Sequence, residues 1–275
     1  MFRENTLKRT LAAGRPALGC WLNMASPVAA EIIGLAGFDF VVIDHEHGPG
    51  TLADGLALLQ AVSGTGATAL MRVPANDPVY VKRALDLGVE GLMFPNINSA
   101  EEARAAVAAC HYPPRGARGA AYALARGADY GLCGERYRDT CSDELVVVCQ
   151  IETVAAVDAI PEIAAVPGVD SLFVGPYDLS ADFGRIGRFD DPEVLALLDR
   201  AEQAILASGS TYGTIPVKGR PTDMLVERGA RLIVAGGDVG FVRNGARAMV
   251  EDFRAVREKR VGGSQEGSQE GSQEG

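Results

Sequence analysis

Two carboxylates in the second half of the chain stand where they could hold a divalent cation. Glu152 closes the apolar run LVVVCQIE, and Asp178 closes the next one, SLFVGPYD. Two carboxylates that lie close together repel each other unless they share a proton or a cation. Oxygen ligands of this kind favour Mg²⁺ or Mn²⁺. The alternative is that each carboxylate only caps the helix that follows its strand.

A second group able to do chemistry is Asp44-His45-Glu46-His47, which follows the apolar run FVVI and contains two of the chain's three histidines. One imidazole could act as a general base or acid, with Asp44 fixing its tautomer. Strand alternation would send both histidines to one face, but the Gly48-Pro49 turn should break that pattern by His47. The pattern alone does not rank the two histidines.

Further polar or glycine residues close other apolar runs. Arg72 follows TALM, and an arginine at a buried strand end needs an anionic partner, such as a substrate carboxylate or enolate. The alternative is a structural salt bridge to Asp44 or Glu46. Gly175-Pro176 and the helix start behind it could present backbone N–H groups to a substrate carboxylate. The backbone N–H groups of Gly236-Gly237 could bind a phosphate; alternatively, the two glycines only allow the chain to turn.

The runs that carry these residues are typical of buried parallel strands, because they lack polar alternation. There are eight, at residues 17–23, 40–46, 68–73, 91–97, 145–152, 171–178, 211–217 and 231–238. Helix starts lie between them, at Ser26-Pro27, at Asp77-Pro78, at a capping box of Ser99 and Glu102, and at Asp191-Pro192. Eight strand–helix units predict an α/β fold, a closed (β/α)8 TIM barrel, rather than a doubly wound sheet. The polar residues that close the strands then meet at one mouth.

The chain shows no linker within its body, so we expect a single barrel domain over residues 1–261. Residues 112–143, rich in Gly, Arg and Ala, are too long for a plain loop and should cover the site or meet a neighbouring subunit. Residues 262–275, GGSQEGSQEGSQEG, form a low-complexity repeat that resembles an expression or linker scar.

Composition excludes several classes of protein. The net charge is −10 and no block of Lys and Arg occurs, which argues against nucleic acid and anionic membranes as partners. No stretch approaches the length of a membrane span. The N-terminus lacks a signal-peptide core, and the five cysteines are scattered without a CxxC pair. We therefore expect reduced thiols and a cytoplasmic location.

Taken together, the motifs resemble the HpcH/HpaI aldolase family of class II, metal-dependent pyruvate aldolases, which includes 4-hydroxy-2-oxoheptanedioate and 2-dehydro-3-deoxyglucarate aldolases. The likeness runs from Gly14 to Phe253 and is carried, in order, by GCWLNMASPVAAEIIGLAGFDFVVIDHEHGP, RVPANDPVYVKRALDLG, YPPRGARG, QIET and GPYDLS. It implies reversible aldol cleavage of 4-hydroxy-2-oxo acids to an aldehyde and pyruvate, or a related 2-oxo acid such as hydroxypyruvate. It also implies a homo-hexamer, a dimer of trimers with exchanged C-terminal helices, in which the segment 112–143 reaches a neighbour.

The resemblance assigns roles to single catalytic residues. In the family's D-x-E-H-[AGS]-P motif, His47 is similar to the catalytic histidine and Asp44 to its orienting partner, while His45 occupies the variable position. Arg72 is similar to the arginine that polarises the substrate, and Asp86 to a further catalytic aspartate.

The resemblance also implies the metal ligands and substrate contacts. Glu152 and Asp178 are similar to the ligands of a divalent ion, Mg²⁺ or Mn²⁺, with Co²⁺ or Zn²⁺ also compatible. Tyr177 stands where many members have Ala or Ser. The residues at the mouth that we expect to contact substrate are Arg72, Trp21, Gln150, Gly175, Pro176, Tyr177 and Asp178.

In the implied mechanism the metal acts as a Lewis acid on the 2-oxo group, Arg72 contacts the developing oxyanion, and His47 moves the proton of the 4-hydroxyl. A Schiff-base aldolase would instead need a desolvated lysine at a strand end, for which Lys218 is the candidate. A barrel that only binds a 2-oxo acid and a citrate-lyase-like C–C lyase on the same metal–enolate site are further alternatives.

Overall fold

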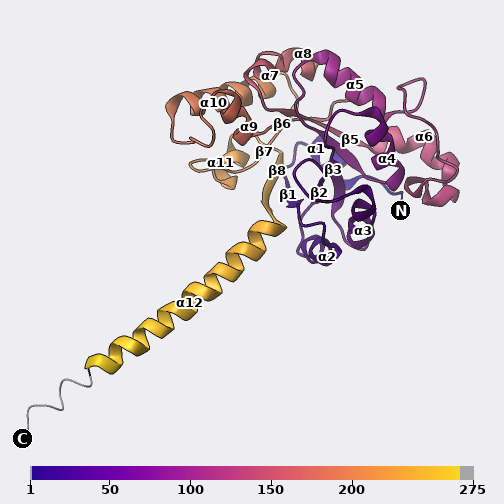
Figure 1. Cartoon of the computed structure of the whole chain (residues 1–275). Helices are drawn as coiled ribbons and strands as arrows, with labels where there is room; N and C mark the ends of the chain where they lie inside the picture. The colour runs from indigo at the N-terminus through magenta and orange to yellow at the C-terminus, as the bar shows by residue number, and fades with distance from the viewer. Residues whose placement is uncertain (1, 267–275) are drawn as a thin grey trace, which may run out of the picture.

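Eight parallel strands pair in sequence order and close on themselves in the computed structural model, which describes residues 2–266 (Figure 1). The predicted (β/α)8 TIM barrel is confirmed, and every predicted apolar run contains one strand. The strands are β1 (Ala17–Leu22), β2 (Phe40–Asp44), β3 (Thr68–Arg72), β4 (Gly91–Phe94), β5 (Val146–Ile151), β6 (Ser171–Val174), β7 (Thr211–Thr214) and β8 (Leu232–Gly237).

Helices surround the barrel, and all four predicted helix starts are confirmed. Ser26, Asp77 and Asp191 cap helices whose next residue is proline. Ser99 accepts a hydrogen bond from the N–H of Glu102, but the Glu102 carboxylate accepts from the N–H of Asn98, so only half of the predicted capping box forms. The helices are α1 (Thr6–Ala12), α2 (Pro27–Leu35), α3 (Leu52–Val62), α4 (Pro78–Leu87), α5 (Ala100–Cys110), the 3-10 helix η1 (Arg126–Gly131), α6 (Gly134–Glu144), α7 (Val154–Asp158), α8 (Ile160–Ala164), α9 (Pro176–Asp182), α10 (Pro192–Ala207), α11 (Thr222–Glu227) and α12 (Asp238–Glu266).

Apolar side chains form two large cores, one inside the barrel and one between the strands and the helices, and a small third cluster lies around Tyr112 and Tyr137. Phe40 and Val42 of β2 point into the interior core, whereas Val41 and Ile43 pack in the outer one. This follows from the two-residue alternation of side chains along a strand. Because both faces are covered by apolar groups, the strand sequences read as continuous apolar runs.

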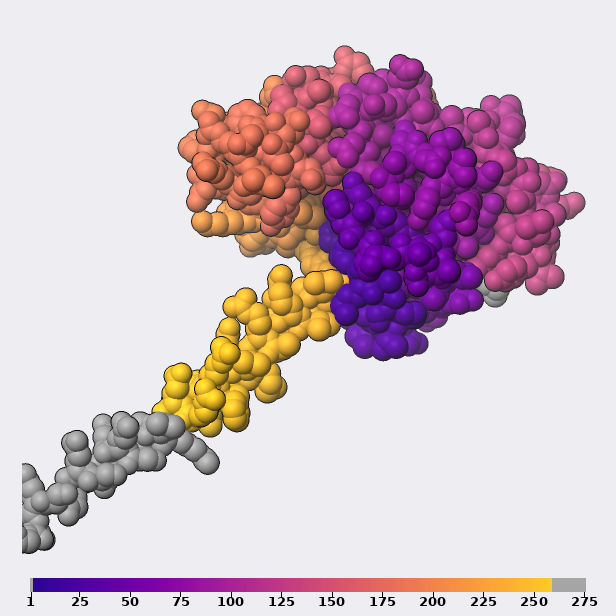
Figure 2. All heavy atoms as spheres, in the orientation of Figure 1, coloured from indigo at the N-terminus to yellow at the C-terminus, as the bar shows by residue number. Residues whose placement is uncertain are grey.

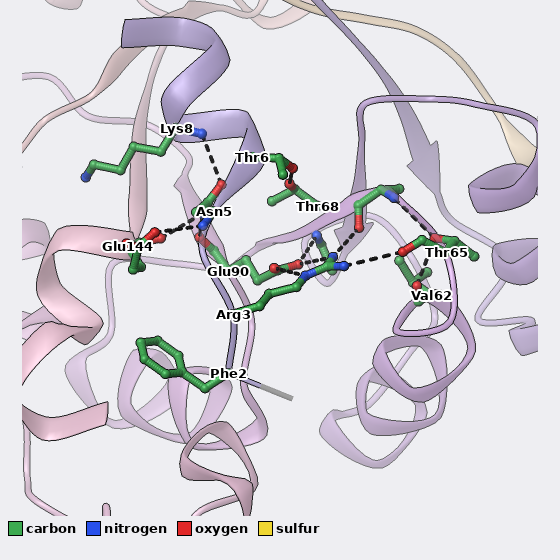
Figure 3. A network of polar contacts seen from close by, with 12 residues as sticks. Phe2, Arg3, Asn5, Thr6, Lys8, Val62, Thr65, Thr68, Glu90 and Glu144 are labelled. Carbon is green, nitrogen blue, oxygen red and sulfur yellow. Dashed lines mark hydrogen bonds and ion pairs between the residues drawn. The ribbon is translucent and has the colours of Figure 1, made fainter. Parts of the chain in front are cut away.

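The N-terminal segment closes the amino-terminal end of the barrel (Figure 3). The Arg3 guanidinium binds the Glu90 carboxylate, with Nε 2.6 Å from Oε1. The Asn5 amide donates to the backbone carbonyls of Glu90 and Glu144, at 2.7 Å each, and its oxygen accepts from the Lys8 N–H to cap α1. Leu7 and Leu11 of α1 then join the interior core. The carboxyl-terminal end of the barrel is left for a site.

The segment 112–143 lies at the same amino-terminal end, so it does not cover the predicted site of its own chain. The Asp129 carboxylate accepts from the N–H of Phe2, Arg126 donates to the Leu87 carbonyl, and the Tyr137 ring packs on the Phe2 ring. The physical reason is chain direction: α5 ends at this end of the barrel, and β5 must begin there.

The C-terminal helix α12 stands away from the rest of the molecule (Figures 1 and 2). Its first turns contact α2, and the Phe241 ring centroid lies 6.3 Å from that of Phe38, which stands between α2 and β2. The predicted terminal repeat begins within this helix, and residues 267–275 lie outside the described residues. None of the described helices combines the length and apolar character needed to cross a membrane.

Candidate active site

A pocket of about 300 Å³ opens at the carboxyl-terminal end of the barrel. It brings together nearly all residues that the sequence predicts for the site. Its lining consists of Trp21, His47, Arg72, Gln150, Glu152, Phe173, Gly175, Pro176, Tyr177, Asp178 and Ile215. These residues follow or belong to strands β1, β2, β3, β5, β6 and β7, as expected for a site at the mouth of such a barrel.

Arg72, the last residue of β3, is buried and paired with two carboxylates. Its Nε and one terminal nitrogen donate to the two oxygens of Asp44 at 2.9 and 2.7 Å, and the other terminal nitrogen lies 2.9 Å from Glu46 Oε2. The Trp21 ring covers the guanidinium, with Cζ 4.4 Å from the ring centroid. The salt bridge considered as the structural alternative is therefore present, and it fixes the arginine at the wall of the pocket.

Asp44 holds the backbone of the turn after β2. Besides Arg72, its carboxylate accepts from the Asn23 amide at 2.6 Å and from the backbone N–H groups of Glu46 and His47 at 3.1 and 3.3 Å. Burial alone would raise the pKa of Asp44, but the hydrogen bond and charge of Arg72 bring it below its ordinary value. Asp44 thus stays ionised and reaches His47 through the backbone rather than through the imidazole.

The two histidines of the stretch point in different directions. β2 ends at Asp44, so strand alternation stops there, and the His47 side chain, 62% exposed, lines the pocket. Its Nε2 lies 3.9 Å from Glu46 Oε2. His45 is buried outside the barrel wall, where its Nδ1 lies 2.6 Å from the Tyr80 hydroxyl. Geometry therefore selects His47 as the imidazole that can meet a substrate.

Glu152, directly after β5, is buried and held from both sides. The Gln150 amide donates to its Oε1 at 2.6 Å, and the N–H of Asn96, in a left-handed conformation with φ +53°, donates to its Oε2 at 3.1 Å. Burial raises the pKa of Glu152 to about 7, and the charge of Asp178 adds to the rise against the opposing hydrogen bond from Asn96. Gln150 therefore positions a carboxylate in addition to lining the pocket.

The donor set suits a divalent cation. Glu152 follows β5, and Asp178 lies in the first turn of α9, behind the neighbouring strand β6; the charge of Asp178 raises the pKa of Glu152. The Gln150 side-chain oxygen is a buried acceptor without a partner among the described residues. Gly175 leaves the space that Glu152 needs, because a Cβ there would lie 2.6 Å from Glu152 Oε1. Oxygen donors of this kind match Mg²⁺ or Mn²⁺.

Two predicted site residues do not line the pocket: Asp44, which lies behind Arg72, and Asp86, which lies away from it. Asp86 lies in the last turn of α4, where its carboxylate accepts from Arg118 at 2.8 Å. Arg118 is buried against the Tyr112 and Tyr137 rings. A helix after a barrel strand runs back toward the amino-terminal end, so the end of α4 is necessarily far from the mouth.

Two other predicted features have structural explanations. Lys218, the Schiff-base candidate, has a side chain 78% exposed that pairs with Asp190 and does not line the pocket. The Gly236-Gly237 pair serves close packing: a Cβ at Gly236, whose φ is +110°, would lie 2.8 Å from the Phe241 ring, and one at Gly237 would lie 3.2 Å from Trp21 Cβ.

The sequence places Asp238 at the mouth, at the end of the eighth apolar run, but the hydrogen bonds that support the site were not predicted. Asp238 is buried and accepts from the N–H groups of Asn23 and Met24 at 2.9 and 3.0 Å, which ties the end of β1 to the end of β8. Asn23 in turn donates to Asp44. Asn23 stands at the end of an apolar run, as the other site residues do, and this position could have identified it. Phe173 and Ile215 were missed because apolar residues in or after a strand usually belong to the core.

Comparison with known proteins places the chain among related enzymes. The model of the family described as "HpcH/HpaI aldolase/citrate lyase" matches residues 17–245. A hydroxypyruvate/pyruvate aldolase of Agrobacterium fabrum is 40% identical over 90% of this chain and 92% of its own length, and a 4-hydroxy-2-oxo-heptane-1,7-dioate aldolase of Escherichia coli is 38% identical over 92% and 96%. A crystal structure of a family member from Burkholderia cenocepacia superposes with a TM-score of 0.86 at 35% identity, covering 91% of this chain and 99% of the other. The chain therefore belongs to the HpcH/HpaI aldolase/citrate lyase family.

Proposed function

We propose that this chain is a carbon–carbon lyase that catalyses the reversible, metal-dependent aldol cleavage of 4-hydroxy-2-oxo acids. The products are an aldehyde and pyruvate, or a related 2-oxo acid such as hydroxypyruvate. The observation that carries the proposal is one pocket in which the Glu152 and Asp178 carboxylates meet a buried arginine and an exposed histidine. The names of the curated relatives, which are pyruvate and 4-hydroxy-2-oxo acid aldolases, support it.

Glu152 and Asp178 would hold the divalent ion, with Mg²⁺ or Mn²⁺ preferred and Co²⁺ or Zn²⁺ compatible. When bound, the ion supplies Lewis-acid stabilisation of the negative charge that develops on the 2-oxo group. Gln150 and the N–H of Asn96 fix the Glu152 carboxylate in place. Gly175 keeps the space beside it open.

Arg72 would stabilise the enolate oxygen of the departing 2-oxo acid. Its guanidinium is held by Asp44 and Glu46 and covered by Trp21, so little reorganisation is needed when charge develops. His47 would take the proton of the 4-hydroxyl during cleavage and return it during condensation, a role that contributes about 10²–10⁴-fold in rate. Asp44 serves both residues, through the Arg72 side chain and the His47 backbone.

A chelation and mutation experiment tests the proposal. We expect pyruvate release from a panel of 4-hydroxy-2-oxo acids to stop on treatment with EDTA and to return with Mg²⁺ or Mn²⁺. Glu152→Ala and His47→Ala should each lower kcat/KM by at least about 10²-fold. Glu162→Ala, an exposed glutamate on α8, is the matched control.

Each alternative has its own signature in the same experiment. Full activity after metal removal would contradict the proposal, and trapping of a covalent adduct by borohydride would favour the lysine mechanism. Thermal stabilisation by a 2-oxo acid without turnover would favour a barrel that only binds. Cleavage of a citrate-like thioester in place of a 4-hydroxy-2-oxo acid would favour the citrate-lyase-like alternative.

We further propose a cytoplasmic homo-hexamer built as a dimer of trimers. Five free cysteines support a reducing compartment. Apolar side chains exposed on α2, namely Val28, Ile32 and Leu35, and on the projecting α12, including Met249 and Phe253, support exchange of the C-terminal helix between subunits. The segment 112–143 remains a candidate for contact with a neighbour.

A further inference from the structure

Asn23, the residue after β1, donates a hydrogen bond to a carboxylate that lies behind the pocket. Its side-chain nitrogen is 2.6 Å from Asp44 Oδ2. Asn23 is not among the described residues that line the pocket. The amide therefore acts on the wall of the site, through Asp44, rather than on a substrate.

Donors on both oxygens fix the Asp44 carboxylate. Oδ2 accepts from Asn23 and from a terminal nitrogen of Arg72 at 2.7 Å, and Oδ1 accepts from Arg72 Nε at 2.9 Å. The backbone N–H groups of Glu46 and His47 also donate to Oδ1. Without the Asn23 amide, the charge on Oδ2 would bear on the guanidinium alone. Asn23 thus helps to set the position of Arg72 and the charge that Arg72 can offer a ligand.

Asn23 is held in turn from the end of β8. The buried Asp238 carboxylate accepts from the N–H groups of Asn23 and Met24 at 2.9 and 3.0 Å. The next residue, Ala25, has a φ of +50°, a left-handed conformation that a residue with a Cβ rarely adopts unless neighbouring contacts impose it. The two hydrogen bonds to Asp238 are such contacts. The turn that closure of the barrel fixes therefore presents the Asn23 amide to Asp44 in one orientation.

We propose that Asn23 is a positioning residue for enolate formation. Its amide orients Asp44, so that Arg72 faces the oxygen on which negative charge develops when the 2-oxo acid loses a proton from C3. This inference rests on the proposed aldol function. A donor that is fixed before the charge appears stabilises that charge without first having to reorganise. Asn23 itself touches no reacting atom.

A double-substitution cycle tests whether Asn23 acts through Arg72. Asn23→Ala should lower kcat for exchange of the pyruvate methyl protons in D₂O at least about tenfold, because a hydrogen bond to a charged group is lost. KM for pyruvate should change little, since the contact matters once charge develops. In an Arg72→Lys background, where the two-pronged contact with Asp44 is gone, the same substitution should change kcat less than about threefold. Equal losses in the two backgrounds would overturn the inference. Gln203→Ala, which removes an exposed amide on α10, is the control and should leave kcat unchanged.

Asn23→Asp gives a pH signature that a purely structural role would not give. The introduced carboxyl group is nearly isosteric with the amide, and two carboxylates this close repel unless they share a proton. Relative to the unchanged protein, kcat of the variant should be lowest at about pH 8 and recover as the pH falls toward about 5.5, when the introduced O–H donates to Asp44. The other charged groups around this carboxylate, Arg72, Glu46 and Asp238, are present in both proteins, so their effect cancels. A ratio of the two kcat values that does not vary with pH would contradict the inference.

Trp21 provides a readout that requires no catalysis. It is the only tryptophan of the chain, and its ring centroid lies 4.4 Å from Arg72 Cζ. Its fluorescence emission should change in Asn23→Ala, and should change no further when Asn23→Ala is added to Arg72→Lys. Full methyl-proton exchange in Asn23→Ala would sink only the present inference. Absence of metal-dependent exchange and cleavage in the unchanged protein would sink the aldol function and the role of Asn23 in it, and Trp21 would then show only whether Asn23 still holds Arg72 in place.

Discussion

His45 and His47 are two positions apart, yet they lie on opposite sides of the barrel wall. His45 fits a slot that Gly55 leaves open, since a Cβ there would lie 2.9 Å from its Cε1. Glycine inside a helix such as α3 costs about 1 kcal/mol of stability relative to alanine. The space that Gly55 leaves for the His45 ring offsets this cost. His45 thereby anchors the turn whose other end presents His47.

The buried imidazole predicts a pH dependence of stability. Burial lowers the pKa of His45, against the opposing charges of Asp44 and Asp54, and Tyr80 completes its surroundings. A histidine whose folded pKa is depressed contributes stability above its unfolded pKa of about 6.5, which is lost as the pH falls toward the folded value. Between about pH 7.5 and about pH 5.5, the free energy of unfolding should therefore fall less in His45→Asn than in the unchanged protein.

Urea denaturation at fixed protein concentration measures this difference. Burial also lowers the pKa of His111, but its contribution is common to both proteins and cancels. Parallel losses of stability in the two proteins would contradict the prediction.

Among the site residues, the sequence identified those that follow a strand. A polar side chain at the end of an apolar run is rarely needed for packing, so it points to a function. Arg72, Glu152 and His47 were found in this way, and all line the pocket. The hydrogen bonds of Asn23 and Asp238 were not predictable, since they depend on how the first and last strands meet when the barrel closes.

The strands were predictable as elements because burial on both faces leaves an unmistakable run of apolar residues. The helices α1 and α6 were not, since each buries too few residues to generate a periodic signal: Leu7 and Leu11 in α1, and Tyr137 and Cys141 in α6 apart from a glycine. Residues 112–143 were expected either to cover the site or to meet a neighbouring subunit, and the first of these expectations was wrong. The length of a loop does not indicate the end of the barrel at which the loop lies.

Closure of the amino-terminal end of the barrel gives a prediction for Asn5. Asn5→Ala removes the N-cap of α1 and leaves the carbonyls of Glu90 and Glu144 without their side-chain donor. We expect a loss of about 2–4 kcal/mol in the free energy of unfolding, from the cap and from the Glu144 carbonyl that loses its side-chain donor, whereas the Glu90 carbonyl still accepts from the Val146 N–H. Denaturant melts measure it, and kcat below the melting transition should not change because the pocket lies at the other end.

Asn76→Ala is the graded control for this experiment, because it removes a single hydrogen bond near the surface. It should cost less than about 1 kcal/mol. Similar losses in the two variants would mean that the Asn5 contacts do not hold the N-terminal segment in place.

The whole molecule has an apolar surface that a single chain leaves uncovered. Val28, Ile32 and Leu35 of α2 are more than half exposed, as are Met249 and Phe253 of α12. Isolated apolar residues are common on protein surfaces, but these stand in rows on two helices, and the proposed exchange of C-terminal helices would cover them. Family resemblance, rather than any pattern in the sequence, supplied the expectation of a hexamer.

A double substitution on the projecting helix tests this assembly. Met249→Glu with Phe253→Glu should lower the molar mass in solution, because two charges would have to be buried without partners. Multi-angle light scattering gives the mass directly. Ile186→Glu, at an equally exposed apolar residue before α10, serves as the control, and an unchanged mass in the double variant would exclude helix exchange through this surface.

The hydrogen bonds from Asp238 through Asn23 and Asp44 to Arg72 join the last strand to the first three. A chain still on the ribosome, with Asp238 not yet emerged, already contains Arg72 and Asp44. It lacks the Asp238 carboxylate that accepts the hydrogen bond from Asn23. Competence for catalysis is then acquired late in synthesis, when the ring closes. Two fragments produced by dividing the chain between β4 and β5 would regain catalytic competence only by assembling into the complete eight-stranded barrel.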